Sequence, residues 1–451
     1  MNVKALTIFL GTRRVGVLFQ YPLAHEHTVN RFVADEAFLN DSRQETLSLS
    51  MRAGDPQAQA AFWKALSGGP LNGSFSRDPK RGWLLPAFFQ NLLPEGPLRT
   101  RIAEMRHCDP EDHFELLAAT GKDLPGDVHA LPAQLSREEL SRYITQNNDA
   151  LEMSVVAEPI EDAISVSGVQ AKLAVLKEGG RFVARTKLTD ASQVRHVIAK
   201  LPVANYANLP ELEDLSLRLA RAAGVNVVEA ELAPLELLVA EHQYELGDVD
   251  AETKFLAVFR YDRDAATTTR RIHCEDFAQI LGVQPEAKYT QDYLTVAAVM
   301  MATPSLGEPA VHELLRRILV NDLMGNPDMH LKNIGIRYLD GTAPELPPAY
   351  DLVAYSAYSS QPRGRALHLV APASGLKPTH DYTARLTPGV VRDFCARLGL
   401  PEKPAWTTLR RCAQKAFDTW PALVQEADIT EKMKERLLAR LDAQRPGKRA
   451  G

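Results

Sequence analysis

A nine-residue segment rich in polar groups, GNPDMHLKN (residues 325–333), follows an apolar, helix-patterned stretch. Four residues separate Asp328 from Asn333, and Asp351 follows eighteen positions after Asn333, within the apolar run PAYDLVAY. Phosphoryl transfer needs a carboxylate that orients the attacking hydroxyl and oxygen ligands for Mg²⁺. An Asp and an Asn at this spacing, with a second Asp further on, are typical of protein kinases. Taken alone, the spacing is equally compatible with a solvated loop.

Phosphoryl transfer also needs a cation on the nucleotide phosphates, and Lys200 in VIAKLP is a candidate for it. A lysine inside a β-branched run is costly to bury without a carboxylate partner. Glu211 and Glu213 lie on the helix that we expect next, and one of them can face the sheet. The alternative is an edge-strand lysine that points to water.

The loop SVSGVQAK (Ser165 to Lys172) is expected between two strands, where its backbone N–H groups could cover phosphates. It contains a single glycine and matches neither GxxxxGK[ST] nor GxGxxG. From its residues alone, the loop is compatible with any hairpin.

The elements that must position these residues follow from the apolar pattern. Residues 163–187 read as strand, tight turn and strand, with Gly179-Gly180 at the turn. Residues 194–202 read as a third strand, which Pro202 ends. Residues 211–224 have leucines at helical spacing and a C-terminal glycine.

Two further apolar runs, 226–240 and 254–262, complete a small sheet that carries one helix. From Asp264 onward the pattern is mostly helical, apart from the polar loop and a hairpin-like segment at 333–355. This hairpin would bring the loops of Asn333 and Asp351 together. The order of elements places a nucleotide in the cleft between the sheet and the helical part.

Length and composition predict an ordinary globular protein of two or three domains. The chain has 451 residues, 45% of them hydrophobic and 24% charged. The net charge of −5 gives no global basic footprint, so charge-driven binding to nucleic acid is not expected. Four scattered cysteines without a CxxC pair predict neither a zinc site nor a disulfide framework, and favour a reducing cytoplasm.

The N-terminal apolar run is broken by Gly11 and by Arg13-Arg14, so no signal peptide is expected. No other segment approaches the length of a membrane span. In the segment RIHCEDFAQ, His273 and Asp276 are expected at the start of a helix, with Glu275 and Asp276 favouring its N-terminus.

Several segments, taken together and in order, resemble the HipA-type serine/threonine kinase toxins of bacterial type II toxin–antitoxin systems. The resemblance implies an α+β, two-lobed, protein-kinase-like fold. Its parts would be a HipA N-terminal subdomain (1–130), a small β-rich lobe with the phosphate loop (131–260) and a helical large lobe with the catalytic loop (261–451). The segments that carry the resemblance are FFQNLLPEG, FELLAATGKDLPGDV, SVSGVQAKLAV, HVIAKLP, LEDLSLRLARAAG, RYDR, RIHCEDFAQILG, KYT, GNPDMHLKNIGI and PAYDLVAY.

The resemblance implies a protein kinase that depends on ATP and Mg²⁺. By matching position, Asp328 would be the catalytic residue, and Asn333 and Asp351 would be the metal ligands. Lys200 would hold the α and β phosphates, and Glu213, which matches the family's helix glutamate better than Glu211 does, would orient it. Further ATP-binding residues would be Ser167, Gly168, Val169, Gln170, Phe259, Tyr261, His330 and Lys332.

In this family a loop serine is also an autophosphorylation site, and Ser165 matches it, with Ser167 as a second candidate. A phosphate there would add nearly two negative charges beside ATP, expel the loop and silence the enzyme. The sequence departs from the family at the adenine hinge, where Phe259 replaces the usual acidic residue. Backbone groups can still contact adenine there.

The partners implied by the resemblance are a helix-turn-helix, DNA-binding antitoxin (HipB-like) and a protein substrate, for example an aminoacyl-tRNA synthetase, whose phosphorylation would arrest growth. DNA would be contacted only through the antitoxin, and no membrane is involved. One alternative is a small-molecule phosphotransferase, which the N-terminal subdomain disfavours. Another is a catalytically idle, kinase-like corepressor, which the intact set of Lys200, Asp328, Asn333 and Asp351 disfavours.

Overall fold

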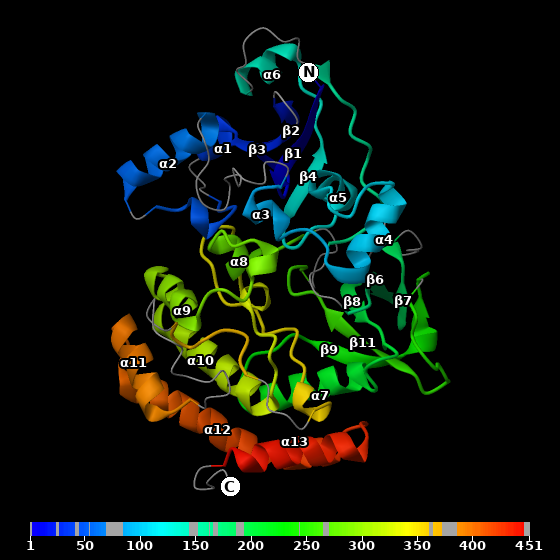
Figure 1. Cartoon of the computed structure of the whole chain (residues 1–451), viewed down its shortest axis with the longest axis vertical. Coiled ribbons are helices and arrows are strands. Elements are labelled where there is room, and N and C mark those ends of the chain that lie inside the picture. Colours follow the sequence, from blue (N-terminus) through cyan, green and yellow to red (C-terminus); the bar gives the residue numbers. More distant parts are fainter. Residues whose placement is uncertain are drawn as a thin grey trace. The chain divides into compact units, whose positions relative to one another are not determined.

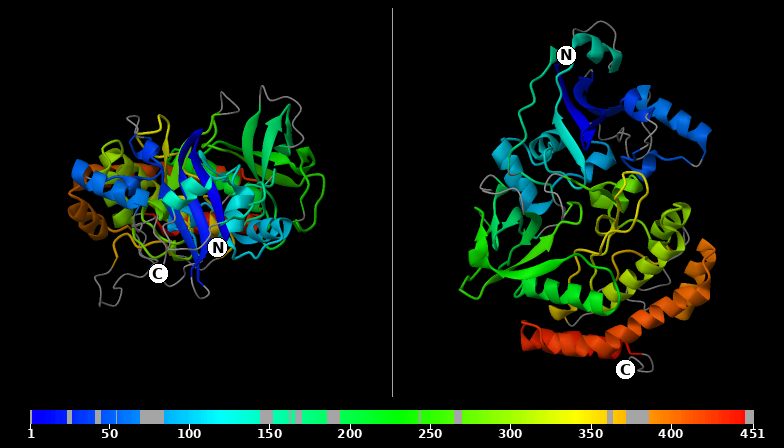
Figure 2. Two further views of the ribbon diagram at one scale, coloured as in Figure 1. Left: turned by 90° about the horizontal axis from the view of Figure 1, so that it is seen from above. Right: turned by 180° about the vertical axis from the view of Figure 1, so that it is seen from behind.

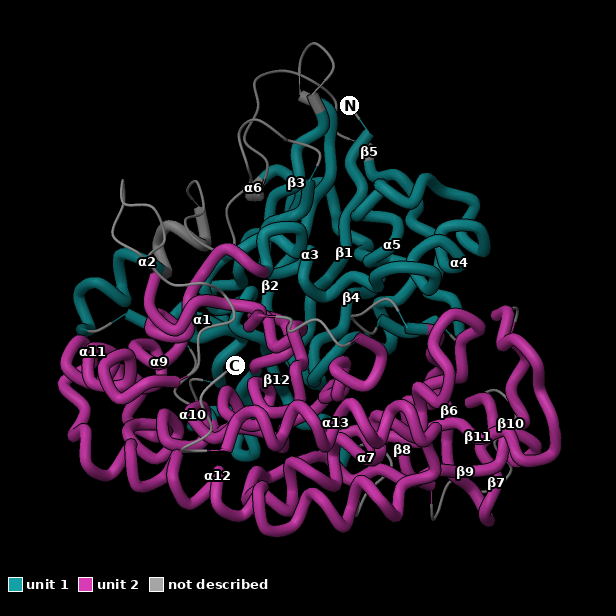
Figure 3. Tube along the Cα trace, turned by 60° about the horizontal axis from the view of Figure 1, so that its bottom comes forward, with its two compact units in different colours: residues 1–170, 262–288, 335–344 teal, residues 171–261, 289–334, 345–451 magenta. Residues whose placement is uncertain are grey.

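The computed structural model of the chain forms two compact units that interleave along the sequence (Figure 3). Unit 1 comprises residues 1–170, 262–288 and 335–344, and unit 2 comprises residues 171–261, 289–334 and 345–451. The division at residues 130 and 260 stays a prediction, because these units follow packing and not contiguous segments. The structure describes residues 2–23, 27–40, 45–53, 55–68, 84–143, 152–161, 163–165, 170–185, 194–242, 244–264, 270–359, 364–371 and 386–445.

Unit 1 is built on an antiparallel sheet with the strand order β3-β2-β1-β4 (Figure 1). Short β5 pairs in parallel with β1. Alternate residues such as Val3, Ala5, Val17 and Phe19 are fully buried and form the core on one face of this sheet. The strands are β1 (Asn2–Leu10), β2 (Arg13–Leu23), β3 (His27–Ala34), β4 (Val128–Pro132) and β5 (Glu152–Met153).

Short helices accompany this sheet. The Asp112 carboxylate accepts the backbone N–H of Glu115 and so begins α5. The helices are α1 (Glu36–Leu39), η1 (Leu49–Met51), α2 (Pro56–Gly68), α3 (Ala87–Gln90), α4 (Gly96–Arg106), α5 (His113–Thr120), α6 (Arg137–Tyr143), α8 (Phe277–Ile280) and η5 (Pro285–Ala287).

A second, two-stranded sheet in unit 1 pairs β12 (His273–Asp276) with β13 (Gly335–Tyr338). Asp276 caps α8 in a capping box with Gln279, which confirms its predicted place at a helix start. His273 instead lies in the strand. Glu275 is buried in the strand as well, where it accepts hydrogen bonds from the Tyr338 hydroxyl and the Leu49 N–H.

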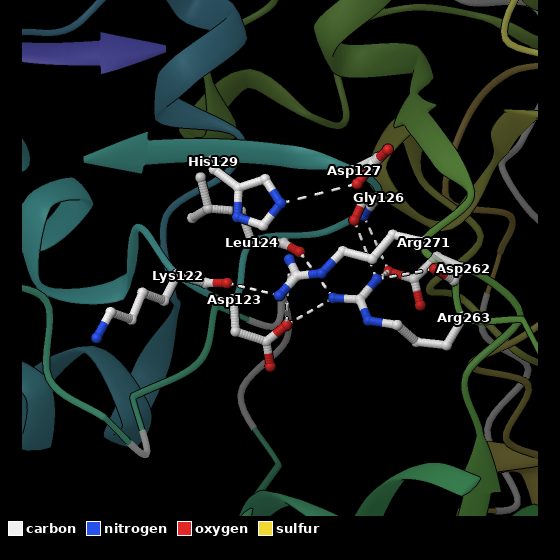
Figure 4. Close-up of polar contacts among 9 residues, drawn as sticks. All are labelled: Lys122, Asp123, Leu124, Gly126, Asp127, His129, Asp262, Arg263 and Arg271. Atoms are coloured by element: carbon white, nitrogen blue, oxygen red, sulfur yellow. Dashed lines mark hydrogen bonds and ion pairs between the residues drawn. The ribbon is translucent and has the colours of Figure 1, made fainter. Parts of the chain in front are cut away.

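A buried ionic network ties distant segments of unit 1 together (Figure 4). The Arg263 guanidinium lies 2.5 Å from the Asp123 carboxylate and 2.8 Å from that of Asp262. It also donates to the Gly126 carbonyl oxygen at 3.0 Å. Arg271 donates to the Lys122 carbonyl oxygen at 2.6 Å. The short segment after residue 261 therefore packs with residues 122–126 inside unit 1.

Unit 2 contains a six-stranded sheet with the order β10-β7-β6-β8-β11-β9. Gly179 and Gly180 both have positive φ (52° and 86°) in the β6–β7 turn, which confirms the predicted hairpin. Central β8 is the third strand of this sheet in chain order, and an edge position for Lys200 is wrong. The strands are β6 (Lys172–Glu178), β7 (Arg181–Val183), β8 (Arg195–Lys200), β9 (Ala230–Pro234), β10 (Leu238–Val239) and β11 (Lys254–Phe259).

The two faces of this sheet belong to different apolar clusters. Leu256 and Val258 pack in the same cluster as α7 (Leu209–Ala222), which is the predicted helix. Phe255 and Phe259 point to the opposite face, since side chains alternate along a strand. Lys200 lies directly opposite Leu256 in the register of β8 and β11, so it shares the face that carries α7.

Helices dominate the rest of unit 2, as the pattern after Asp264 predicts (Figure 2). They are η4 (Leu235–Leu237), α9 (Tyr293–Ala302), α10 (Gly307–Met324), η6 (Leu331–Asn333), η7 (Tyr355–Ala357), α11 (Pro388–Leu398), α12 (Glu402–Gln425) and α13 (Glu431–Ala443). Within the part of the chain that the structure describes, none of the helices is both long and apolar enough to span a membrane.

The predicted hairpin at residues 333–355 is wrong. Strand β13 pairs with β12 instead, and Ala349 forms a parallel bridge with Val227. Pro347 and Pro348 lack the N–H groups that a returning strand would need to donate. Asp351 is therefore placed by the segment around Val227 and not by its own hairpin.

The predicted strand before the loop at 165–172 is also wrong, because β6 begins only at Lys172. The backbone N–H of Ser165 donates to the Asp123 carbonyl oxygen at 3.0 Å. The Ser165 hydroxyl donates to the Leu92 carbonyl oxygen. These hydrogen bonds belong to unit 1, so the described residues at the start of this loop pair with no strand of the small sheet.

Candidate active site

Lys200 holds two carboxylates at once. Its ammonium donates to Oε1 of Glu213 and, at 2.5 Å, to Oδ1 of Asp351. Burial alone would lower the pKa of Lys200, but the charges of Asp351 and Glu213 outweigh it and raise this pKa. The lysine is therefore protonated, and of the two candidate glutamates Glu213 is the one that meets it.

Helix α7 positions both Glu213 and the segment after Asp351. Glu213 is 1% exposed and projects from the buried face of α7, as does Ser216 on the next turn. The Ser216 hydroxyl accepts the backbone N–H of Ala354 at 2.9 Å. Asp351 itself has φ +59°, a left-handed conformation that Asp tolerates better than most residues. This turn directs the carboxylate to Lys200.

Lys172 is a site residue that the sequence reasoning missed. It is 2% exposed and lies directly opposite Lys200 in the register of β6 and β8. Burial would raise the pKa of Asp351, but the charges of Lys200, Lys172 and His330 lower it well below its usual range. A signal was present: Lys172 begins an apolar strand at a core position, although it reads as the last residue of a loop.

The Asp328 carboxylate lies on the loop between α10 and η6, and its side chain is 40% exposed. The Tyr289 hydroxyl donates to its Oδ1 at 2.6 Å, and Nε2 of His330 lies 3.7 Å from the same oxygen. A hydrogen bond within the loop stabilises it, since the Asn326 side chain accepts the Asp328 N–H at 3.1 Å. Tyr293 donates to the Met329 carbonyl oxygen at 2.8 Å.

Asn333 donates from Nδ2 to the backbone carbonyl oxygen of Asp328 at 2.8 Å. A carbonyl oxygen only accepts, so the NH₂ group of the amide must face it. This orientation leaves the side-chain oxygen of Asn333 as the group that can bind a cation.

Lys332 and Tyr261 are connected through Tyr350, the residue before Asp351. The Lys332 side chain is buried, and its carbonyl oxygen accepts the Tyr350 hydroxyl at 3.1 Å. The ring of Tyr350 stacks on that of Tyr261 with a centroid distance of 5.4 Å. The structure thus links these two predicted residues with the segment that carries Asp351.

The Tyr355 hydroxyl is influenced by three acidic side chains of the candidate site. Burial raises its pKa to about 12, and the charges of Asp328, Asp351 and Glu213 contribute to this rise. Three acidic side chains from α7, the loop after α10 and the loop after β13 therefore act on one hydroxyl. These contributions place all three side chains within electrostatic range of Tyr355 in unit 2.

The Phe259 ring is not brought to this place. It lies on the other face of the sheet, with the Arg195 guanidinium carbon 3.7 Å from its centroid. The backbone N–H of Phe259 donates to the Glu229 carbonyl oxygen. Ser165 and Gln170 belong to unit 1, and Ser167, Gly168 and Val169 lie outside the described residues.

The donor set suits a magnesium nucleotide. Among the described residues, no group of three or more His, Cys, Asp or Glu is arranged to hold a metal ion. Mg²⁺ needs no such cage, because it is usually held by one or two protein oxygens together with substrate phosphates and water. Asn333 and Asp351 would supply such oxygens, and Lys172 and Lys200, which are buried, would supply positive charge for the phosphates.

Known proteins resemble this chain over almost all of its length. Two proteins of Sinorhizobium fredii, each named "Putative kinase", are 30% identical to it. The alignment with Y4dM covers 89% of this chain and 88% of that protein, and the alignment with Y4mE covers 79% of both.

Among solved structures, the HipA, HipB and operator DNA complex of the Shewanella oneidensis MR-1 toxin–antitoxin system matches with a TM-score of 0.61 and 20% identity. This match covers 97% of this chain and 96% of that one, and it confirms the predicted α+β, kinase-like fold. The sequence model of the HipA N-terminal domain matches residues 6–131, and that of the HipA-like C-terminal domain matches residues 164–420. The chain therefore belongs to the HipA family of kinase-like proteins.

Proposed function

We propose that this protein is a serine/threonine kinase that uses ATP and Mg²⁺ and acts as the toxin of a type II toxin–antitoxin module. The observation that carries the proposal is the contact of buried Lys200 with Glu213 and Asp351. A lysine held by a helix glutamate and a metal-binding aspartate are the parts that a kinase must have in place.

Each side chain then has a distinct task. Asp328 accepts the proton of the attacking serine hydroxyl. Asn333 and Asp351 hold the metal, which when bound neutralises charge on the β and γ phosphates. Lys200 and Lys172 bind phosphate oxygens from the sheet side. For adenine we assign the main chain around residue 260 and the Tyr261 ring, since the Phe259 ring faces away.

Autophosphorylation at Ser165 or Ser167 is part of the proposal. The Ser165 hydroxyl is 1% exposed and donates to the Leu92 carbonyl oxygen. A phosphoserine has no proton for that bond and carries close to two negative charges, so it cannot stay at this buried position. Phosphorylation would therefore keep the loop displaced and the kinase silent.

The partners that we propose are a HipB-like, DNA-binding antitoxin and a protein substrate such as an aminoacyl-tRNA synthetase. The Shewanella oneidensis HipA was solved together with HipB and operator DNA, which supports the first. The net charge of −5 favours contact with DNA through the antitoxin and not through this chain. The substrate assignment rests on family resemblance.

The test is incubation of the purified protein with labelled ATP and Mg²⁺, alone, with a cell extract, and with small metabolites. Wild type should label a loop serine and a protein in the extract, and Asp328→Ala should label neither. Asp418→Ala, a change on the exposed face of α12, serves as the matched control and should label both. Labelled metabolites would favour a small-molecule phosphotransferase, and no labelling at all would favour the idle corepressor.

A further inference from the structure

The Tyr289 side chain touches the catalytic loop at the residue that matters most for the reaction. Its hydroxyl donates to Oδ1 of Asp328 at 2.6 Å. Its ring meets the ring of His330 edge-on, with a centroid distance of 4.9 Å. This tyrosine lies in the KYT segment shortly before α9.

The Asp328 carboxylate has reason to need such a contact. Its side chain is 40% exposed, and the terminal torsion of an aspartate is broad. A carboxylate that rotates freely spends little time in the orientation needed to accept the proton of the substrate hydroxyl. The hydrogen bond from Tyr289 removes this freedom at one oxygen. The packing of the Tyr289 ring on His330, whose side chain is 5% exposed, fixes the phenol in turn.

The Tyr289 hydroxyl does not have to leave for the substrate to bind. A carboxylate has two oxygens with about four acceptor positions, so it can accept one hydroxyl from Tyr289 and another from a substrate. The 40% exposure of Asp328 is measured with Tyr289 in contact, so the carboxylate is still accessible to a serine from another protein. The geometry therefore indicates that Tyr289 supports Asp328 and does not block the place where the substrate hydroxyl binds.

We infer that Tyr289 is a positioning residue, which orients the Asp328 carboxylate toward the acceptor hydroxyl without itself contacting ATP. This inference rests on the proposed kinase function. It concerns the rate of phosphoryl transfer and not the affinity for nucleotide, because the Tyr289 hydroxyl donates to Asp328.

The test compares wild type with Tyr289→Phe, which removes the hydroxyl and keeps the ring against His330. We expect kcat for phosphoryl transfer to fall about ten-fold, as for a lost hydrogen bond to a charged group, with KM for ATP and the melting temperature unchanged. Tyr206→Phe is the matched control, since Tyr206 is a similarly exposed tyrosine of unit 2 (43% against 47%), and it should retain the wild-type kcat.

A second measurement does not depend on activity. The infrared carboxylate band of Asp328, identified by its loss in Asp328→Asn, should shift in Tyr289→Phe, and this shift should be absent when both changes are combined. An inactive wild type that shows this shift would refute the kinase function and leave the contact intact. An unshifted band, an unchanged or raised kcat, a parallel loss of ATP affinity, or phosphate on Tyr289 itself would overturn the positioning role.

Discussion

The ammonium nitrogen of Lys200 lies 2.5 Å from a carboxylate oxygen of Asp351, a residue 151 positions further along the chain. This contact joins a central strand of the sheet to a loop that follows the segment of Asp328 and Asn333. The pair is buried on the lysine side, where only 7% of the side chain is exposed, so solvent screens it little.

Lys200→Met should both inactivate and destabilise the protein. The change leaves buried Glu213 and partly buried Asp351 without their cation, and breaking a buried pair typically costs about 3–5 kcal/mol of unfolding free energy. Urea denaturation measures the loss. Lys177→Met is the control on the same sheet: Lys177 pairs with half-exposed Glu231, and a pair of this kind contributes less than about 1 kcal/mol. Equal losses in both variants would contradict a special role for the buried pair.

Lys172→Met should weaken nucleotide binding more than it weakens the fold. Lys172 is buried beside Lys200, and its charge acts on Asp351 and Glu213. If it contacts phosphate, its loss should raise the Kd of ATP about ten-fold, which is the usual effect of one charge-assisted hydrogen bond. Equilibrium binding of ATP and of adenosine separates the effects, because adenosine has no phosphate and should bind both proteins alike. A matching loss for adenosine would argue against a phosphate contact.

The stability of unit 1 should depend on pH through Glu275. Burial raises the pKa of this carboxyl to about 7 in the folded chain, from 4.5 in the unfolded chain. The unfolded carboxyl loses its proton first, so the stabilisation is fully present below pH 4.5 and disappears as the pH rises through 7. The shift corresponds to about 3 kcal/mol.

Glu275→Gln keeps an acceptor for the Tyr338 hydroxyl and the Leu49 N–H and carries no charge. Its unfolding free energy should lack this decline between pH 4.5 and 7 and should exceed that of wild type at pH 8. Denaturant titrations at several pH values measure it. Parallel curves for the two proteins would show that Glu275 titrates normally.

Arg263→Met should unfold unit 1 more readily than a comparable surface change does. Arg263 is 3% exposed at its side chain and holds Asp123 and Asp262, which would be left buried without its guanidinium. We expect a loss of about 3–5 kcal/mol in unfolding free energy. Arg270→Met is the control, because the Arg270 side chain is 62% exposed and meets Asp264 only at 3.5 Å. A loss below about 1 kcal/mol in both variants would contradict the prediction.

The residues that the sequence predicted best are those that local pattern can define. Lys200 and Glu213 each lie in a periodic apolar segment, so the strand and the helix that carry them could be predicted, whereas the choice of Glu213 over Glu211 came from the family resemblance. The predicted hairpin at 333–355 was wrong because β13 pairs with β12, which lies more than fifty residues earlier in the chain. Local spacing holds no information on the choice of such a distant strand partner.

Side-chain contacts between distant segments likewise could not be predicted from the sequence. The hydrogen bond from Tyr289 to Asp328 depends on how the loop before α9 packs on His330. The Phe259 ring lies away from the proposed nucleotide site, because side chains alternate along the strand and place it on the side of Phe255. The residues of the hinge alone do not show on which face of the sheet this ring lies.

The buried contacts of Arg263 bear on how this chain can be divided for experiments. A fragment that begins at residue 164, where the match to the C-terminal family domain starts, would keep Arg263 and Asp262 but lose Asp123 and Gly126, with which they pair. It would expose a charged surface that evolved as an interior. A separately expressed C-terminal domain should therefore unfold more readily than the full chain, whereas adding the N-terminal residues back as a second chain should restore its stability.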